Sequence, residues 1–307
     1  KLNENLNKGL IDNIKNNNLD KVWMAVPELV DWADVSGFSY KNDKDDLKAD
    51  ILLADFISNL PDSEKNNLTL DVFNRRIYCF GASSDELKHQ WKAFNCLYCE
   101  IQDDKEKKTH LLSNGKWYEV ENDFAKQVND GYKQLRDSAA LISLPTYKCK
   151  NENEYNKETA KNNTDFCCMD RELISHGGGY SKIEFCDLYT KDKKIIHVKH
   201  YGGSAVLSHL FSQGVVSGEL LLADKEFREK VNEKLPNGYK LSNPNDKPNS
   251  SDFQIIFGII SSSSKQLEIP FFSKVSLRNA KRRLETYGYK VSLQKISAEE
   301  TEKTNKN

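Results

Sequence analysis

One stretch near the end of the chain limits the possible folds more than any other. Residues 253–260, with the sequence FQIIFGII, are almost continuously apolar. A strand that alternates apolar and polar residues buries one face, whereas a continuous apolar run is typical of a strand buried on both faces. We therefore expect a mixed α+β fold, in which a mixed central sheet is flanked by helices.

Other segments of the second half supply further strands and helices for this sheet. Apolar patterns predict strands over 166–174, 182–190, 193–201 and 289–296. Capping residues and glycines predict a helix from Ser204 to Gly214 and a basic helix from Ser276 to Gly288. Residues 146–165 are polar and nearly without large aliphatic side chains, which predicts a long surface loop.

The first half has a different pattern. Between residues 94 and 121 three segments predict an antiparallel meander, and Asn114-Gly115 is the strongest hairpin signal in the chain. We expect three parts: an N-terminal α/β region over 1–150, a C-terminal α/β region over 151–300, and a disordered tail over 301–307.

The composition excludes some classes of protein. With 38% hydrophobic, 30% charged and 10% aromatic residues, the chain is too aromatic for a disordered protein. The net charge is −1, so affinity for nucleic acid must come from local patches. No apolar run approaches the roughly 20 residues that span a bilayer, so we expect no membrane partner.

The cysteines and the N-terminal sequence indicate where in the cell the protein is located. The count of seven cysteines is odd, and no secretion signal precedes them, which favours reduced thiols in the cytoplasm. Cys96 and Cys99 have zinc-like spacing but lack a second pair, so we expect buried thiols there. The sequence lacks an initiator Met, which indicates that it starts within a longer chain.

A hairpin predicted over residues 183–203, IEFCDLYTKDKKIIHVKHYGG, carries titratable groups in strands that otherwise look buried. They are Glu184, Asp187, His197 and Lys199. Carboxylates bind Mg²⁺ through hard oxygen ligands, a water on the metal can act as nucleophile, and a lysine can stabilise the charge on an attacked phosphate. We therefore predict that Glu184 and Asp187 hold Mg²⁺, that Lys199 stabilises the phosphate, and that His197 serves as ligand or proton shuttle.

The same hairpin resembles a degenerate form of the PD-(D/E)xK motif of restriction endonucleases. That motif has an Asp on one strand and (Asp/Glu)-x-Lys on the next; here Asp187 is followed by His197-Val198-Lys199. The resemblance implies a restriction-endonuclease-like fold in the C-terminal half. His stands where the motif has an acidic residue, and Glu184 could supply the missing carboxylate.

Strand geometry restricts how these groups combine. Side chains alternate along a strand, so in a regular hairpin Glu184 and Asp187 point to opposite faces. Only one of them can then share a face with Lys199, unless a β-bulge intervenes. The alternative is a purely structural hairpin with a polar, solvent-facing side and a Glu184–Lys199 ion pair.

Two sets of residues are candidates for contact with nucleic acid. Ser208 and Gln213 follow the hairpin and are predicted to orient the substrate. Arg278, Lys281 and Arg282 fall at i, i+3 and i+4 of the basic helix, which predicts a stripe that contacts phosphates. A solvated helix surface is the alternative for this stripe.

Four segments carry a resemblance to a known family: Glu184 to Leu188, Ile196 to Lys199, Ser204 to Gly214 and Asn114 to Phe124. They resemble a sporadically distributed bacterial protein family of unknown function, whose members occur in mobile and defence gene neighbourhoods. The resemblance implies a role in biological conflict, such as anti-phage defence, and brings no catalytic residues of its own.

Three functions remain open at this point. The first is a Mg²⁺-dependent nuclease, a phosphodiester hydrolase or a degenerate relative of one, acting in defence against foreign nucleic acid. The second is a non-catalytic sensor or binding subunit of a defence complex that recognises nucleic acid or a phage protein. The third is an assembly subunit, either a homo-oligomer or one whose partner defence subunit supplies the activity.

Overall fold

The structure is a computed structural model that describes residues 2–19, 21–28, 35–48, 51–81, 86–103, 105–138, 142–176 and 181–299. It confirms a mixed α+β fold with sheets of mixed strand orientation. The chain forms two compact units. The first contains residues 1–130, 201–206 and 268–274, and the second contains residues 131–200, 207–267 and 275–307. The predicted tail over 301–307 lies outside the described residues.

The first unit is built on two antiparallel sheets, one with the order β1-β5-β6-β7 and one with the order β2-β3-β4. Their strands are β1 (Val22–Met24), β2 (Val35–Ser39), β3 (Arg76–Gly81), β4 (Leu87–Lys92), β5 (Leu97–Asp103), β6 (Lys108–Ser113) and β7 (Lys116–Glu121). The helices around them are α1 (Leu2–Lys15), α2 (Leu53–Ser58), α3 (Asp62–Asn66), the 3₁₀ helix η2 (Leu70–Asn74) and α4 (Ala93–Cys96).

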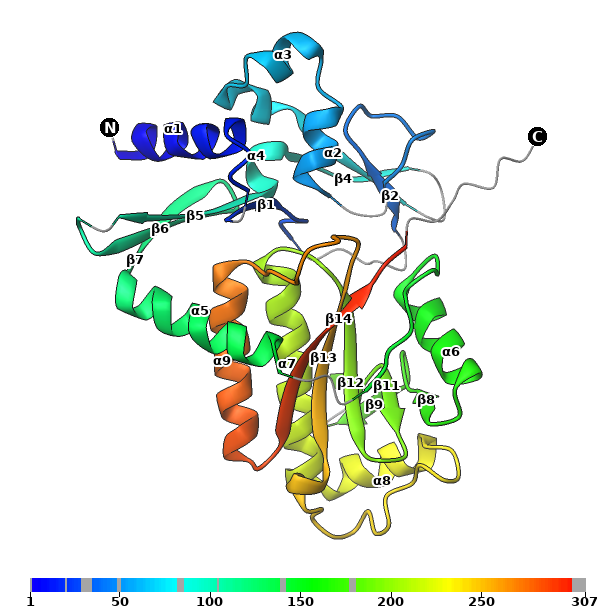
Figure 1. The fold of residues 1–307 in the computed structure, drawn as a ribbon. Helices are drawn as coiled ribbons and strands as arrows, with labels where there is room; N and C mark the ends of the chain where they lie inside the picture. The colour runs from blue at the N-terminus through cyan, green and yellow to red at the C-terminus, as the bar shows by residue number, and fades with distance from the viewer. Residues whose placement is uncertain are drawn as a thin grey trace. The chain divides into compact units, whose positions relative to one another are not determined.

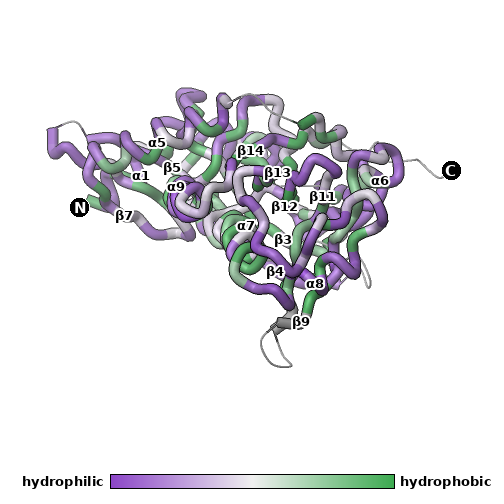
Figure 2. Tube along the Cα trace, turned by 90° about the horizontal axis from the view of Figure 1, so that it is seen from below, coloured by the Kyte–Doolittle hydropathy of each residue, from purple (hydrophilic) through white to green (hydrophobic). Residues whose placement is uncertain are grey.

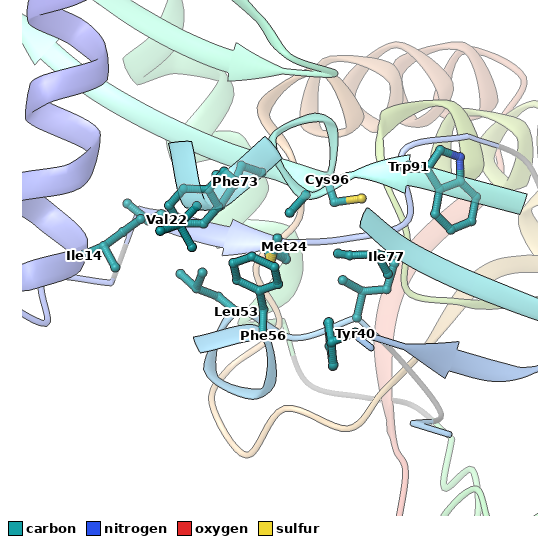
Figure 3. Close-up of a cluster of buried hydrophobic side chains, with 14 of the residues drawn as sticks. Ile14, Val22, Met24, Tyr40, Leu53, Phe56, Phe73, Ile77, Trp91 and Cys96 are labelled. Atoms are coloured by element: carbon teal, nitrogen blue, oxygen red, sulfur yellow. The ribbon is translucent and has the colours of Figure 1, made fainter. Parts of the chain in front are cut away.

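The core of the first unit lies between α1, α2 and the strands, and Figure 3 shows its central side chains. Helix α1 places Leu6, Leu10, Ile11 and Ile14 on one buried face, the spacing of an amphipathic helix. The predicted meander is confirmed as β5-β6-β7. At its turn Asn114 and Gly115 both have positive φ, 48° and 69°, as a type I′ hairpin requires.

The second unit is built on a five-stranded sheet with the order β14-β13-β12-β11-β8 (Figure 1). Its strands are β8 (Phe166–Cys168), β11 (Leu188–Thr190), β12 (Lys194–His200), β13 (Gln254–Ser261) and β14 (Lys290–Ser297). A separate two-stranded ribbon pairs β9 (Leu173–His176) with β10 (Ser181–Glu184). The helices are α6 (Glu152–Asn162), α7 (Ser204–Ala223), α8 (Lys225–Lys234), the 3₁₀ helix η3 (Ser250–Asp252) and α9 (Phe271–Thr286), and α5 (Asn122–Arg136) links the units along the chain.

Strand β13 is buried on both faces, as its sequence predicts. It lies parallel to β12 on one side and to β14 on the other, and all eight of its residues are buried. Ile256 and Ile260 pack with Tyr155 of α6 in one cluster. Phe257 points to the opposite face, where its ring meets Phe211 of α7 edge-on with centroids 5.1 Å apart.

The prediction of a loop over 146–165 is wrong, because residues 152–162 form α6. The Asn151 side chain caps this helix by accepting the N–H of Glu154, while the Glu154 carboxylate accepts the N–H of Lys150. These reciprocal bonds act like a capping box and supply the start signal. Tyr155, Asn156 and Thr159 give the helix a narrow buried face.

The prediction that Gly214 ends its helix is also wrong, since α7 continues to Ala223. A Cβ at Gly214 would lie 2.5 Å from the ring of Phe257, so glycine here permits close packing of helix on sheet. Figure 2 shows α7 as a largely hydrophobic helix. Among the described residues it is the one helix whose length and composition suit a membrane span, and 56% of its most apolar window is buried in the fold. Core helices share this composition.

The hairpin over 183–203 is not the regular one that the sequence predicts. Strand β10 ends at Glu184 in the two-stranded ribbon, and β11 starts at Leu188 in the five-stranded sheet. Between them the Asp187 carbonyl accepts the N–H groups of Met169 (2.9 Å) and Asp170 (3.2 Å), which bends both segments. The chain thus changes sheets within three residues, and side-chain alternation does not carry across that step.

Candidate metal centre

Three carboxylates from separate segments converge at the point where the chain changes sheets. Asp170 follows β8, Glu184 ends β10, and Asp187 precedes β11. In the part of the chain that the structure describes, these three form one group whose oxygen atoms all lie within 4.8 Å of one another, and each residue is partly buried. Glu184 and Asp187, which strand alternation would separate, are therefore brought together.

Each carboxylate is held by donors from the protein. The Asn153 and Asn156 side-chain amides of α6 both donate to Asp170 Oδ2, at 3.0 and 3.1 Å. The Arg171 N–H donates to Glu184 Oε1. The Val198 N–H of β12 donates to Asp187 Oδ2 at 2.7 Å. These bonds fix the three groups in place before anything binds.

The proximity of the carboxylates alters their acidity. Burial raises the pKa of Asp187 well above its ordinary value, and the charge of Glu184 raises it further, against the bond from Val198. Burial also raises the pKa of Glu184, and the charge of Asp170 adds to this, while the Arg171 N–H and the charge of Lys199 lower it. Positive charge placed among these groups would relieve their repulsion.

The charge of Lys199 acts on Glu184, and the lysine is itself paired. Its Nζ is 2.9 Å from Glu152 Oε2, and the other oxygen of Glu152 accepts the His200 N–H at 2.8 Å. This ion pair is only 20% exposed on the lysine side and 16% on the glutamate side. Glu152 is the first residue of α6, so the helix that sequence analysis missed supplies a fourth carboxylate next to the cluster.

A known protein family covers nearly the whole chain. The model of DUF6119, a family of unknown function, matches residues 1–297. The chain belongs to this family. No curated protein and no solved structure shows significant similarity to it. The resemblance to a family of unknown function, drawn from the sequence, is thereby confirmed.

In this member of DUF6119, His197 lies apart from the carboxylates. Its side chain is buried, with Nε2 3.1 Å from Ser217 Oγ of α7 and the ring 6.2 Å from that of Phe257. Burial lowers its pKa to about 3, so the ring is neutral at physiological pH. The structure does not bring it to the cluster, where it was expected as a ligand or proton shuttle.

The residues predicted to contact nucleic acid lie on α7 and α9 of the DUF6119 fold. Ser208 Oγ is 2.8 Å from Ser276 Oγ, so it joins the two helices. Gln213 is partly buried. On α9, Arg278 and Arg282 are exposed, and Lys281 pairs with Glu285 one turn later at 2.8 Å.

The remaining sequence candidate, the cysteine pair of the first unit, consists of buried free thiols as predicted. Cys96 and Cys99 lie in its hydrophobic core, and burial raises the pKa of Cys99 to about 12. A thiol of that pKa is protonated at physiological pH.

Sequence reasoning missed Asp170 and Glu152, together with the asparagines that hold Asp170. The capping pattern around Asn151 could have revealed α6 and hence Glu152. Asp170 carries no such signal, because its role depends on hydrogen bonds to a segment 17 residues away along the chain. The donor set is composed of carboxylate oxygens, which suits Mg²⁺, Mn²⁺ or Ca²⁺ better than a metal that prefers sulfur or nitrogen.

Proposed function

We propose that this chain is a metal-dependent nuclease that acts in the cytoplasm in bacterial anti-phage defence. One observation carries the proposal: three carboxylates converge within 4.8 Å, and the charge of Lys199, which is paired with Glu152, acts on Glu184 among them. The resemblance to a family from defence neighbourhoods supports the biological setting. The order Asp187, then Lys199 on the next strand, supports the likeness to restriction endonucleases.

Asp170, Glu184 and Asp187 would hold the cation. When bound there, Mg²⁺ supplies Lewis-acid polarisation of a phosphate and a water of lowered pKa. In hydrolysis the water oxygen would form a bond to phosphorus and release one of its protons to solvent, the bond from phosphorus to the leaving oxygen would break, and the leaving oxygen would take up a proton from solvent.

The other residues of the site would orient the substrate and neutralise the charge on its phosphate. Lys199 would place its ammonium next to the charge that develops on the attacked phosphate. Glu152 fixes the position of that ammonium through a 2.9 Å ion pair. Asp170 and Glu184 take the place of the acidic residue that the endonuclease motif has where this chain has His197. The exposed Arg278 and Arg282 offer contacts to a phosphate backbone.

A second candidate, a non-catalytic subunit that binds nucleic acid or a phage protein, is favoured by a different observation. Every carboxylate of the cluster already accepts a hydrogen bond from the protein, and Lys199 is paired with Glu152. Carboxylates whose hydrogen bonds are already made in this way could have a purely structural role. They would then join β12, α6 and the segment between β10 and β11 where the chain changes sheets. The two candidates differ in whether a cation binds and whether a phosphodiester is cut.

The deciding experiment measures cation binding and cleavage together. Purified protein is titrated with Mn²⁺ by calorimetry and is incubated with single- and double-stranded DNA and RNA in the presence of Mg²⁺ or Mn²⁺. We expect cleavage of at least one substrate, and a loss of about 10²-fold or more in Asp187→Asn, Glu184→Gln and Lys199→Met. Asp187→Asn and Glu184→Gln should also weaken Mn²⁺ binding.

Glu172→Gln is the matched control. Glu172 lies two residues from Asp170, but its carboxylate pairs with Lys234 at the surface, so cleavage and Mn²⁺ affinity should stay at the wild-type level. Wild-type protein that binds no cation and cuts no substrate would contradict the nuclease and favour the binding subunit.

A further inference from the structure

Helix α6 brings a buried amide to the acidic cluster of the second unit. Asn156 belongs to the narrow buried face of this helix and is 0% exposed. Its Nδ2 donates to Asp170 Oδ2 at 3.1 Å, so the amide end of the side chain points at the cluster of Asp170, Glu184 and Asp187. The other end of the same amide, Oδ1, is buried without a hydrogen-bond partner.

The unpartnered oxygen of Asn156 has an energetic cost. A buried acceptor that has lost its water and gained no donor destabilises a fold, and such atoms are rare in native proteins. Binding to a cation would remove this cost, because side-chain amide oxygens serve beside carboxylates as ligands of hard cations. Asn153 is the contrasting case. It donates to the same Asp170 oxygen at 3.0 Å, but it is only partly buried, so water can reach it.

The spacing of Asn156 and Asp170 suits a shared cation. Two neighbouring ligands of an octahedral Mg²⁺, each about 2.1 Å from the ion, lie about 3.0 Å apart, and Asn156 Nδ2 is 3.1 Å from Asp170 Oδ2. The two ends of an asparagine amide are nearly equal in size, so a half-turn places Oδ1 where Nδ2 now lies. That orientation sets oxygen against a carboxylate and is unfavourable unless a cation lies between them.

We propose that Asn156 is a fourth ligand of the cation, and that its amide reverses when the cation binds. This role rests on the proposed function, because it requires the three carboxylates to bind a metal ion. A neutral ligand suits the position, since three carboxylates already outweigh the charge of a divalent cation. Four protein oxygens also leave places in an octahedron for water and a phosphate oxygen, both of which hydrolysis requires.

Substitutions at positions 156 and 153 separate a ligand from a residue that only holds Asp170 in place. The Mn²⁺ affinity of the full chain is measured by calorimetry for wild type, Asn156→Asp, Asn156→Leu and Asn153→Asp. Both Asp substitutions remove one donor to Asp170 and add one negative charge, but only the one at position 156 places an oxygen on the cation. Asn153→Asp is therefore the matched control for the added charge and for the lost hydrogen bond.

We expect Asn156→Asp to bind Mn²⁺ at least as tightly as wild type. Asn156→Leu and Asn153→Asp should bind it about tenfold or more weakly, the usual effect of losing a group that orients a ligand. A crystal structure of the wild type with Mn²⁺ should place Asn156 Oδ1 within coordination distance of the ion. Thermal melts show whether each variant folds: without cation Asn156→Asp should melt below wild type, and saturating Mn²⁺ should raise its melting temperature more than that of Asn153→Asp.

Three results would overturn the role of Asn156 and leave the nuclease proposal intact, provided that wild type binds Mn²⁺. The first is equal Mn²⁺ affinity of Asn156→Asp and Asn153→Asp. The second is an affinity of Asn156→Asp as low as that of Asn156→Leu. The third is a Mn²⁺ complex in which Nδ2 of Asn156 still faces Asp170. Wild type that binds no Mn²⁺ would contradict both the fourth ligand and the metal centre, so the two failures can be told apart.

Discussion

Single residues in this chain are governed by burial more than by their chemical type. Phe257 and Ser217 surround His197, and burial lowers its pKa to about 3. Glu184 and Asp187 are affected in the opposite direction, with their pKa values raised first by burial and then by neighbouring carboxylates. The same desolvation thus keeps a histidine neutral and favours protonated carboxyls.

His197 should make the fold sensitive to acid. Its pKa is near 6.5 in the unfolded chain and about 3 in the folded one, so between these values the unfolded state binds more protons. Stability should therefore fall as pH drops below about 6.5, by up to about 1.4 kcal/mol per pH unit. Denaturant titrations of wild type and His197→Gln between pH 7 and 4 measure this slope.

The difference between wild type and His197→Gln in the slope of stability against pH isolates the contribution of His197. This comparison is needed because Asp187 contributes a slope of the opposite sign in both proteins. Its raised pKa gives stability that is present at low pH and lost as pH rises above about 4. A curve for His197→Gln parallel to that of wild type would show that protonation of His197 does not drive acid unfolding.

At the scale of the element, two helical glycines occupy opposite environments. Gly131 of α5 has no neighbouring atom within 4 Å of the place where a Cβ would be. Gly214 of α7 has the ring of Phe257 at 2.5 Å from that place. Helix propensity favours alanine at both positions by about 1 kcal/mol. A difference in stability between the two alanine variants therefore reflects packing alone.

Gly131→Ala should therefore stabilise the protein by about 0.5–1 kcal/mol. Gly214→Ala should destabilise it by about 1–3 kcal/mol, because the added methyl group overpacks the contact between α7 and β13. Urea unfolding midpoints of both variants, compared at equal m-values, provide the measurement. Equal stabilisation by both substitutions would contradict the close contact of α7 with the sheet.

Elements with a strong local signal were the ones that the sequence predicted well. The apolar run of β13 and the Asn114-Gly115 turn are examples, since burial and positive φ are encoded in a few adjacent residues. Helix α6 was missed because its signal is a cap and one narrow buried face, not an apolar stripe. The break between β10 and β11 depends on bonds from Met169 and Asp170 to Asp187, which no local pattern contains.

The residues of the candidate site show the same difference between local sequence signals and long-range contacts. Residue type alone pointed to Glu184, Asp187 and Lys199, because carboxylates and a lysine are unusual in an apolar hairpin. Asp170 and Glu152 come from segments that only the folded chain brings near; the capping pattern around Asn151 points to the helix that carries Glu152, but no local pattern points to Asp170. The prediction from strand alternation that Glu184 and Asp187 are separated was wrong, because it assumed one continuous strand where the chain changes sheets.

At the scale of the whole molecule, neither compact unit is a single continuous segment. The first unit is completed by residues 201–206 and 268–274. The Gly203 N–H donates to the Val26 carbonyl at 2.6 Å, and Lys274 compensates the buried Glu100. The boundary near residue 150 predicted from the sequence is a single cut, and it would remove both of these segments from the first unit.

A fragment of residues 1–150 should therefore not fold cooperatively. It leaves Glu100 without Lys274, and breaking a buried pair by loss of one partner costs about 3–5 kcal/mol, in addition to the lost packing of Phe271 and Phe272. Circular dichroism melts of the fragment and of the full chain test this. The same fragment with Glu100→Gln shows how much of the loss is due to charge. A fragment that melts cooperatively near the temperature of the full chain would contradict the prediction.

The carboxylates beside β12 have a consequence for aggregation. Beyond the start of β11, the N–H groups of Val198 and His200 face a side of β12 where no strand of the described residues pairs, and Asp187 and Glu152 accept their bonds. An unpaired strand edge is a template for another chain, and charged groups that cap it block such pairing. Alanine at either position would open this edge and promote self-association, so loss of activity in such a variant could reflect insolubility. Asparagine and glutamine keep an acceptor at the edge and are the informative replacements.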